Sequence, residues 1–296
     1  MFENKRTDLK KASVNEKARY NFTYIEMGDF QGFENALEDI YQRRIDGLII
    51  KNALSPGAIG ELIEFVDSRE NDLVDEHLIE EKRGFTYPVS FSKAPADIEE
   101  RKKYFLKNEI DREFINNNIS IENVIVETFK KLSGGRSVEV PKGRDGIGTF
   151  SGFTFRKLVP EFGNLPIHCG NVFHQNFAEF YSHLDSLCKV KNQLSYFYTL
   201  QSAEGGELIL FDIEWKDGQQ MDGIKHVFDI DGSSIDSTEG MGLKRMSIPT
   251  EEGDLLLFAG GEIWHSVNKV SGSRDRITIG GFLAFSNDDK KILFWS

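Results

Sequence analysis

The stretch GDLLLFAGGEIWHSV, residues 253–267, decides the predicted fold of this chain. A Gly-Asp turn leads into an apolar run of strand length, and His265 then lies on the next run of the same kind. Short apolar runs separated by turn residues are typical of β-structure. The stretch therefore predicts two consecutive strands, the second of which carries a histidine.

A further strand follows and carries two basic side chains and a hydroxyl. Within GSRDRIT, residues 272–278, the side chains of Arg274, Arg276 and Thr278 are spaced two apart and would share one face of an extended strand. An arginine fork beside a hydroxyl suits bidentate capture of a carboxylate. The alternative is that these are ordinary arginines of a surface strand. The order of the elements favours the carboxylate site.

Short apolar runs of this kind occur from about residue 138 onward, whereas the pattern before residue 138 is mainly helical. Predicted strands cover residues 137–140, 148–158, 194–200, 207–211, 245–248, 254–258, 263–267, 276–285 and 292–295, with a helix over about 175–190 among them. Predicted helices cover about 29–44, 56–67, 96–108, 111–117 and 120–132, with one strand at 47–52. This order predicts an α+β fold, in which a helical N-terminal half packs on a double-stranded β-helix (a jelly-roll or cupin-like core).

Composition restricts the class of protein. The chain has 296 residues, 39% of them hydrophobic, which is enough to bury a full core. A net charge of −12 argues against a nucleic-acid or anionic-membrane partner. No apolar run reaches the roughly 18 residues of a membrane span, and the N-terminus lacks a signal-peptide core. Two cysteines provide neither a disulfide framework nor a Cys-rich zinc site. We expect a cytoplasmic protein.

Two segments lack the periodicity of packed elements. Residues 1–20 are charged and aperiodic, which predicts a flexible arm ahead of a single domain over residues 21–296. The Gly-rich polar stretch 216–242 is too long for a tight connection. Because it follows a predicted strand near the mouth of the barrel, we regard it as a candidate substrate lid, with a solvent-exposed insertion as the alternative.

Two segments compete to supply a second histidine. His183 and Asp185 have the His-x-carboxylate form of the two-histidine, one-carboxylate iron sites, whereas the residue two after His168 is Gly170. His183 lies in a segment with helical periodicity, and residues two apart on a helix point in different directions. His168 lies in an extended stretch, where residues two apart share a face. We therefore predict that His168 and His265 bind the metal, since a histidine pair with a following arginine is the skeleton of 2-oxoglutarate-dependent oxygenases.

Several residues of these segments could have a structural role instead. His168 could be a buried, hydrogen-bonded histidine without a metal, and His183 is best explained as an ordinary helix histidine. His174 is close enough to line a substrate pocket, although a place at a helix start is more common. Cys169 should point away from the metal and act as a small core residue. If His168 is a ligand, Gly170 removes the expected carboxylate and opens a coordination position that chloride or bromide could fill.

Several segments together resemble one known family. They are IDGLII (45–50), LSG (132–134), VEVP (138–141), IHCGN (167–171), QLSYF (193–197), GGEL (205–208), EW (214–215) and IGGFLAFS (279–286). On these segments the chain, from about residue 38, resembles the Fe(II)/2-oxoglutarate halogenases of hapalindole, ambiguine and welwitindolinone biosynthesis. GGEL is common to many 2-oxoglutarate enzymes, whereas IHCGN and IGGFLAF are much more specific.

The resemblance implies a function and a set of site residues. It implies chlorination of an aliphatic carbon of a freestanding small molecule, without a carrier protein, using Fe(II), 2-oxoglutarate, chloride or bromide, and O₂ as co-substrate. It assigns the iron ligands to His168 and His265 and the halide seat to Gly170. For 2-oxoglutarate, Arg276 with Thr278 fits best and Arg274 remains possible. The alternatives are a 2-oxoglutarate-dependent hydroxylase and a non-catalytic cupin-like binding protein.

Overall fold

The computed structural model describes most of the chain, namely residues 20–72, 74–75, 84–91, 94–95, 97–176, 178–215 and 244–296. The candidate lid 216–242 lies outside these residues, as do the first 19 residues of the predicted arm. Tyr20, which we placed at the end of that arm, is buried and donates its hydroxyl proton to the carbonyl oxygen of Phe211 at 2.7 Å. The body of the protein therefore begins at Tyr20 or earlier, and the division into arm and domain otherwise stays a prediction.

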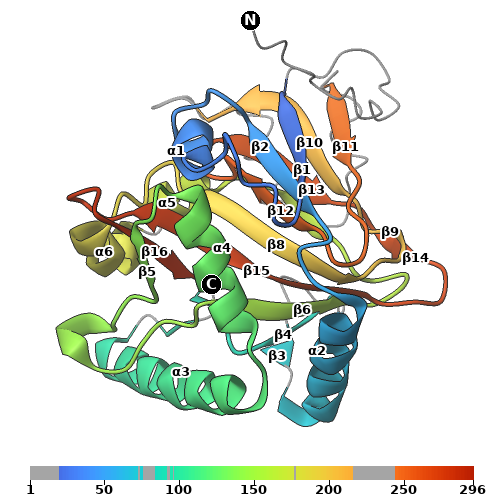
Figure 1. The fold of residues 1–296 in the computed structure, drawn as a ribbon. Coiled ribbons are helices and arrows are strands. Elements are labelled where there is room, and N and C mark those ends of the chain that lie inside the picture. Colours follow the sequence, from blue (N-terminus) through green and yellow to red (C-terminus); the bar gives the residue numbers. More distant parts are fainter. Residues whose placement is uncertain are drawn as a thin grey trace, which may run out of the picture.

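One large sheet organises the fold (Figure 1). Its main path is β1 (Phe22–Glu26), β2 (Gly47–Lys51), β12 (Leu255–Phe258), β8 (Leu194–Gln201), β15 (Arg276–Phe285), β6 (Thr154–Leu158), β4 (Phe85–Tyr87) and β3 (Val74–Asp75). Beside it, β16 (Lys291–Trp295) pairs with β15 and with β5 (Ser137–Glu139). The N-terminal half is therefore not purely helical, because β1 to β4 extend the sheet.

A second, antiparallel sheet faces the first. It runs β11 (Arg245–Ile248), β10 (Leu208–Glu214), β13 (Ile263–Val267) and β7 (Leu165–His168), and β14 (Val270–Ser271) pairs separately with β9 (Glu204–Gly205). The ring of Phe258 on β12 meets the ring of His265 on β13 edge-on, with centroids 4.9 Å apart. Side chains of the two sheets thus meet in one interior, and the predicted α+β fold with a jelly-roll core is confirmed.

The helices differ from the prediction in their bounds. They are α1 (Ala36–Tyr41), α2 (Pro56–Ser68), α3 (Ile98–Asn118), α4 (Ile121–Leu132), α5 (Gly170–Asn176) and α6 (Ala178–Leu187). The two helices predicted over 96–108 and 111–117 form the single helix α3, since no glycine or proline separates them. The helix predicted over 29–44 is reduced to α1, because Phe30 and Phe33 pack on the core from turns. No helix in the described part of the chain is long and apolar enough to cross a bilayer.

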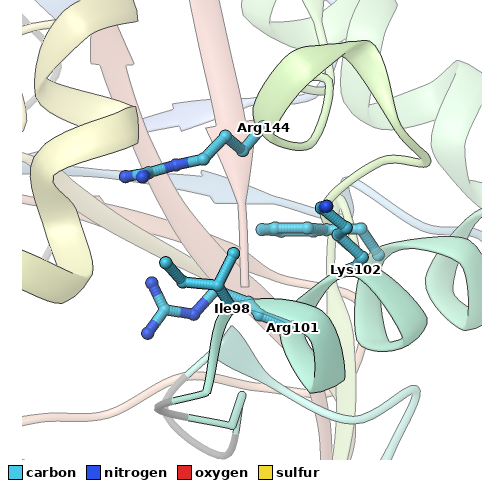
Figure 2. Close-up of a pocket in the computed structure, with 5 residues that line it drawn as sticks. Ile98, Arg101, Lys102 and Arg144 are labelled. Atoms are coloured by element: carbon cyan, nitrogen blue, oxygen red, sulfur yellow. The ribbon is translucent and has the colours of Figure 1, made fainter.

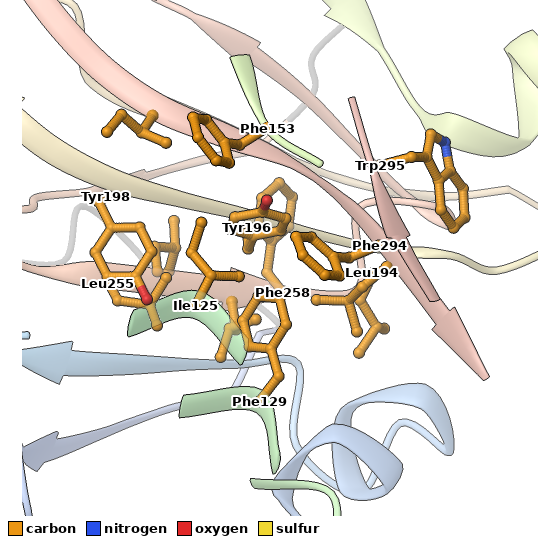
Figure 3. Close-up of a cluster of buried hydrophobic side chains, with 14 of the residues drawn as sticks. Ile125, Phe129, Phe153, Leu194, Tyr196, Tyr198, Leu255, Phe258, Phe294 and Trp295 are labelled. Carbon is orange, nitrogen blue, oxygen red and sulfur yellow. The ribbon is translucent and has the colours of Figure 1, made fainter. Parts of the chain in front are cut away.

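The core is aromatic where α4 crosses the large sheet. Figure 3 shows Ile125 and Phe129 of α4 together with Tyr196 of β8 and Phe294 of β16. The ring of Phe129 meets that of Tyr196 edge-on at 4.9 Å between centroids, and Phe129 is fully buried. The buried hydroxyl of Tyr196 donates to the carbonyl oxygen of Gly152 at 2.8 Å. These contacts fix β8, which runs through the centre of the sheet.

The packing of Phe129 leads to a stability prediction. Replacing Phe129 by alanine should lower the free energy of unfolding by about 3–5 kcal/mol, because the change leaves a cavity between α4 and the sheet. Glu127→Ala, an exposed position on the same helix, should change it by no more than about 0.5 kcal/mol. Urea unfolding followed by circular dichroism measures both; similar losses in the two variants would contradict the packing argument.

Candidate metal centre

The two predicted histidine ligands lie next to each other. His168 is the last residue of β7 and His265 is the middle residue of β13, and the antiparallel pairing of these strands sets the two directly opposite. Their ring centroids are 4.2 Å apart. Directly opposite residues of an antiparallel pair point to the same side of the sheet. The register therefore brings together two residues that are far apart in the sequence.

Hydrogen bonds to the backbone fix the tautomer of both rings. Nδ1 of His168 lies 2.7 Å from the carbonyl oxygen of Pro166, and Nδ1 of His265 lies 2.8 Å from that of Ile263. A carbonyl oxygen only accepts, so each Nδ1 carries a proton, and in the neutral ring Nε2 then presents its lone pair. Metal-binding histidines are commonly oriented by such a bond from the other ring nitrogen. The pair thus offers two Nε2 donors.

The surroundings of His265 favour its neutral form. The side chain is 7% exposed, and this burial holds its pKa well below the usual range, with the nearby His168 acting in the same direction. The rings of Phe258 and His265 meet edge-on, and the ring centroids of Phe173 and His168 are 5.7 Å apart. A neutral imidazole is the form that binds a metal. Two such donors fit Fe(II).

Gly170 lies two residues after the end of β7 and is the first residue of α5, at the sequence position where the carboxylate of an oxygenase would be. Its amide donates to the carbonyl oxygen of Gly260 at 2.9 Å. An ideal Cβ built on Gly170 would lie 2.8 Å from Nε2 of Gln193 and 3.1 Å from Cα of Gly261. Within the described ranges no three His, Cys, Asp or Glu side chains gather in a way that could hold a metal. Two residues after His168 there is thus a position where any side chain would require its neighbours to shift.

The rival His-x-Asp pair faces elsewhere. His183 and Asp185 lie on α6, as the periodicity predicts. Nε2 of His183 is 3.0 Å from the carbonyl oxygen of Lys142, and a carboxylate oxygen of Asp185 is 2.9 Å from Nε2 of His174. His174 thus lies on α5 in an ion-pair geometry with α6. Neither residue of the rival pair accompanies His168.

Cys169 has the character expected of a core residue. It is fully buried in a small apolar cluster, and burial raises the pKa of its thiol to about 12. At neutral pH the sulfur is therefore protonated, as expected of a buried structural cysteine and not of an activated nucleophile.

The two candidate arginines have different environments. Arg276, the first residue of β15, is 7% exposed, and its guanidinium carbon lies 5.2 Å from the ring centroid of Phe197. Burial, followed by the charge of Arg156, lowers the pKa of Arg276 to about 10, so it stays protonated at neutral pH. Thr278 is also buried, two residues along the same strand. This leaves a buried cation beside a buried hydroxyl.

Arg274 does not share that strand face, contrary to our expectation. Strand β14 ends at Ser271 and β15 begins only at Arg276, so Arg274 lies in the connecting turn. Its side chain is 58% exposed and pairs with Glu252 at 3.1 Å. The expected alternation does not reach Arg274 because the extended backbone starts two residues after it.

Sequence reasoning missed the residues that close the site. Gly206 has a φ of +70°, and a Cβ there would lie 2.7 Å from Cδ of Arg276, so the glycine of the GGEL segment allows this arginine to pack against the chain. It also missed Phe197, whose ring lies against Arg276, and Gln193, which lies beside Gly170. Both belong to the QLSYF segment, where alternation predicts a shared face, but only the sheet order shows what that face meets.

A surface hollow beside α3 is separate from these residues. It is lined by Ile98, Arg101, Lys102, Phe105 and Arg144 (Figure 2). None of the predicted site residues contributes to its lining. The hollow is therefore not part of the candidate site.

Comparison with known proteins identifies the family and the fold. A family model described as carrier-protein-independent halogenase WelO5 matches residues 19–296. An N-substituted L-amino acid dioxygenase from Burkholderia ambifaria AMMD, in complex with alpha-KG, has 16% identity and a TM-score of 0.54, covering 87% of this chain and 90% of that one. A second structure of an N-substituted L-amino acid dioxygenase from the same organism gives 13% identity and a TM-score of 0.54 over the same shares. No curated protein matches the chain.

The histidine geometry predicts which variants lose metal. His168→Ala and His265→Ala should each weaken binding of Fe(II), or of Co(II) as a spectroscopic substitute, by at least about tenfold, since each removes one of two nitrogen donors. His183→Ala should bind as the wild type does, because that side chain contacts Lys142 instead. Anaerobic titration with Co(II), followed by its visible absorption, gives the affinities. Unchanged binding in either of the first two variants would rule that histidine out as a ligand.

Proposed function

The chain belongs to the carrier-protein-independent halogenase WelO5 family, and we propose that it halogenates an unactivated aliphatic carbon of a freestanding small molecule. The family match confirms the resemblance drawn from the sequence, and the protein is an Fe(II)/2-oxoglutarate-dependent oxidoreductase. The observation that carries the proposed reaction is Gly170 beside His168, where an oxygenase would supply a carboxylate.

In this proposal the histidines hold the iron and Gly170 leaves space for the halide. His168 and His265 bind Fe(II) through Nε2, which their backbone hydrogen bonds leave unprotonated. When bound, iron with 2-oxoglutarate and O₂ supplies the oxidation of the C–H bond, and chloride or bromide supplies the new substituent. A carboxylate at position 170 would oppose a halide by its volume and its negative charge. The absence of a side chain there thus selects halogenation over hydroxylation.

Arg276 binds 2-oxoglutarate in the same proposal. Its guanidinium is buried and protonated, and the charge of Glu207 acts on its pKa, but no carboxylate among the described residues forms an ion pair with it. A buried cation without a carboxylate of its own favours an anionic ligand. The fork of the guanidinium suits the distal carboxylate of 2-oxoglutarate, and the hydroxyl of Thr278 can donate a further hydrogen bond.

Substitution of Gly170 tests the halogenase assignment. Gly170→Asp should convert the product from chlorinated to hydroxylated, because the carboxylate takes the halide position, provided that iron still binds. Gly170→Ala, which meets the same neighbours without adding a ligand, separates crowding from coordination. Mass spectrometry of products, with and without chloride, measures the ratio. Continued chlorination by the aspartate variant, or products independent of chloride in the wild type, would refute the assignment.

The arginines provide a matched pair for 2-oxoglutarate binding. Arg276→Gln should raise the Kd for 2-oxoglutarate about tenfold or more, since a charge-assisted hydrogen bond is worth roughly 1.5–3 kcal/mol. Arg274→Gln removes an exposed charge that already pairs with Glu252, and it should leave the Kd within about twofold. Anaerobic titration of the Fe(II) enzyme, followed by the visible charge-transfer band, gives both constants. The reverse order of effects would move the site to Arg274.

A further inference from the structure

The carboxamide of Gln193 lies beside Gly170, on the side where any other residue would carry its Cβ. Nε2 of Gln193 is 2.8 Å from where a Cβ of residue 170 would be, and its Cγ is 3.2 Å from the same point. The side chain is 1% exposed, and its Oε1 is buried without a hydrogen-bond partner among the described residues. Buried amides normally have their polar atoms satisfied. The carboxamide of Gln193 is thus buried against Gly170, and its Nε2 is the atom nearest to the absent side chain.

The backbone on either side of Gln193 is held firmly. Its amide donates to the carbonyl oxygen of Val190 at 3.0 Å, and its carbonyl oxygen accepts from the amide of Gly261 at 2.8 Å. The preceding residue, Asn192, is bound twice by the side chain of Asn171, at 2.7 and 2.8 Å. Asn171 directly follows Gly170, so these bonds tie the glutamine to the same short segment as the glycine. The carboxamide is therefore preorganised relative to position 170.

The strand that follows Gln193 faces the candidate site. Gln193 directly precedes β8, and alternation puts its side chain on the same face as that of Phe197. The ring of Phe197 lies against the guanidinium of Arg276. One strand face thus runs from the proposed 2-oxoglutarate arginine to the proposed halide position.

From the carboxamide of Gln193 directed at the open position of Gly170, we infer that Gln193 donates an N–H to the bound halide and positions it. This inference rests on the proposed halogenase function. A halide is a small monoanion, and a neutral N–H donor stabilises it with a charge-assisted hydrogen bond while adding no competing ligand. Gln193 is thus a positioning residue for the halide.

Halide affinity of the anaerobic holoenzyme tests the inference without turnover. Chloride is titrated into the Fe(II)/2-oxoglutarate enzyme, and the shift of its visible charge-transfer band gives the Kd. Gln193→Met keeps the length of the side chain but has no donor, and Gln193→Glu replaces the donor by an acidic group. Gln42→Glu, at an exposed position after α1, adds the same charge away from the site and serves as the control.

The expected pattern separates positioning from packing. We expect the chloride Kd to rise about tenfold in Gln193→Met and at least as much in Gln193→Glu, with the wild-type value in Gln42→Glu. The 2-oxoglutarate Kd should stay within about twofold in all three. Wild-type chloride affinity in both Gln193 variants would overturn the inference and leave the halogenase proposal intact. A parallel loss of 2-oxoglutarate affinity would assign Gln193 to packing and also overturn it. Absence of any chloride response in the wild type would overturn both.

Discussion

The antiparallel pairing of β7 with β13 is the constraint on which the site depends. It sets His168 opposite His265 and brings their rings to 4.2 Å between centroids. The same two strands supply the carbonyl oxygens, each two residues before its histidine, that fix the tautomers. The same strand pair thus determines where the two histidines lie and which nitrogen of each ring carries the proton. A slip of one residue would turn one histidine to the other side of the sheet and separate the pair.

The second constraint is the close approach of three chain segments around Gly170. The amide of Gly170 donates to Gly260, and Gly261 is hydrogen-bonded to Gln193. There is no room for a Cβ at Gly170 unless Gln193 or the backbone of Gly261 shifts. A missing carboxylate could have been a mere loss of function. Here the surroundings are packed against a glycine, so the absence of a side chain at this position is part of the local structure.

Two buried basic groups are accommodated in opposite ways. His265 is kept neutral, because burial lowers its pKa below the neutral range. Arg276 stays protonated even though burial lowers its pKa to about 10, and its guanidinium lies against the ring of Phe197. Neutral nitrogen donors suit a metal cation, whereas a buried guanidinium suits an organic carboxylate. The two solutions match the two cofactors that an Fe(II)/2-oxoglutarate enzyme requires.

The sequence by itself determined what depends on local periodicity. Helical spacing correctly placed His183 and Asp185 on a helix, because neighbours within a few residues decide that pattern. The extended stretch expected at His168 is β7, but it ends there, and Gly170, which we expected on the same extended face, begins α5. Only the tertiary structure decided what depends on pairing between distant segments. It put Arg274 in the connection before β15 and set Gln193 beside Gly170. It also added the four N-terminal strands, β1, β2, β3 and β4, to the large sheet. These outcomes follow from strand register and close packing, which no single stretch of the sequence encodes.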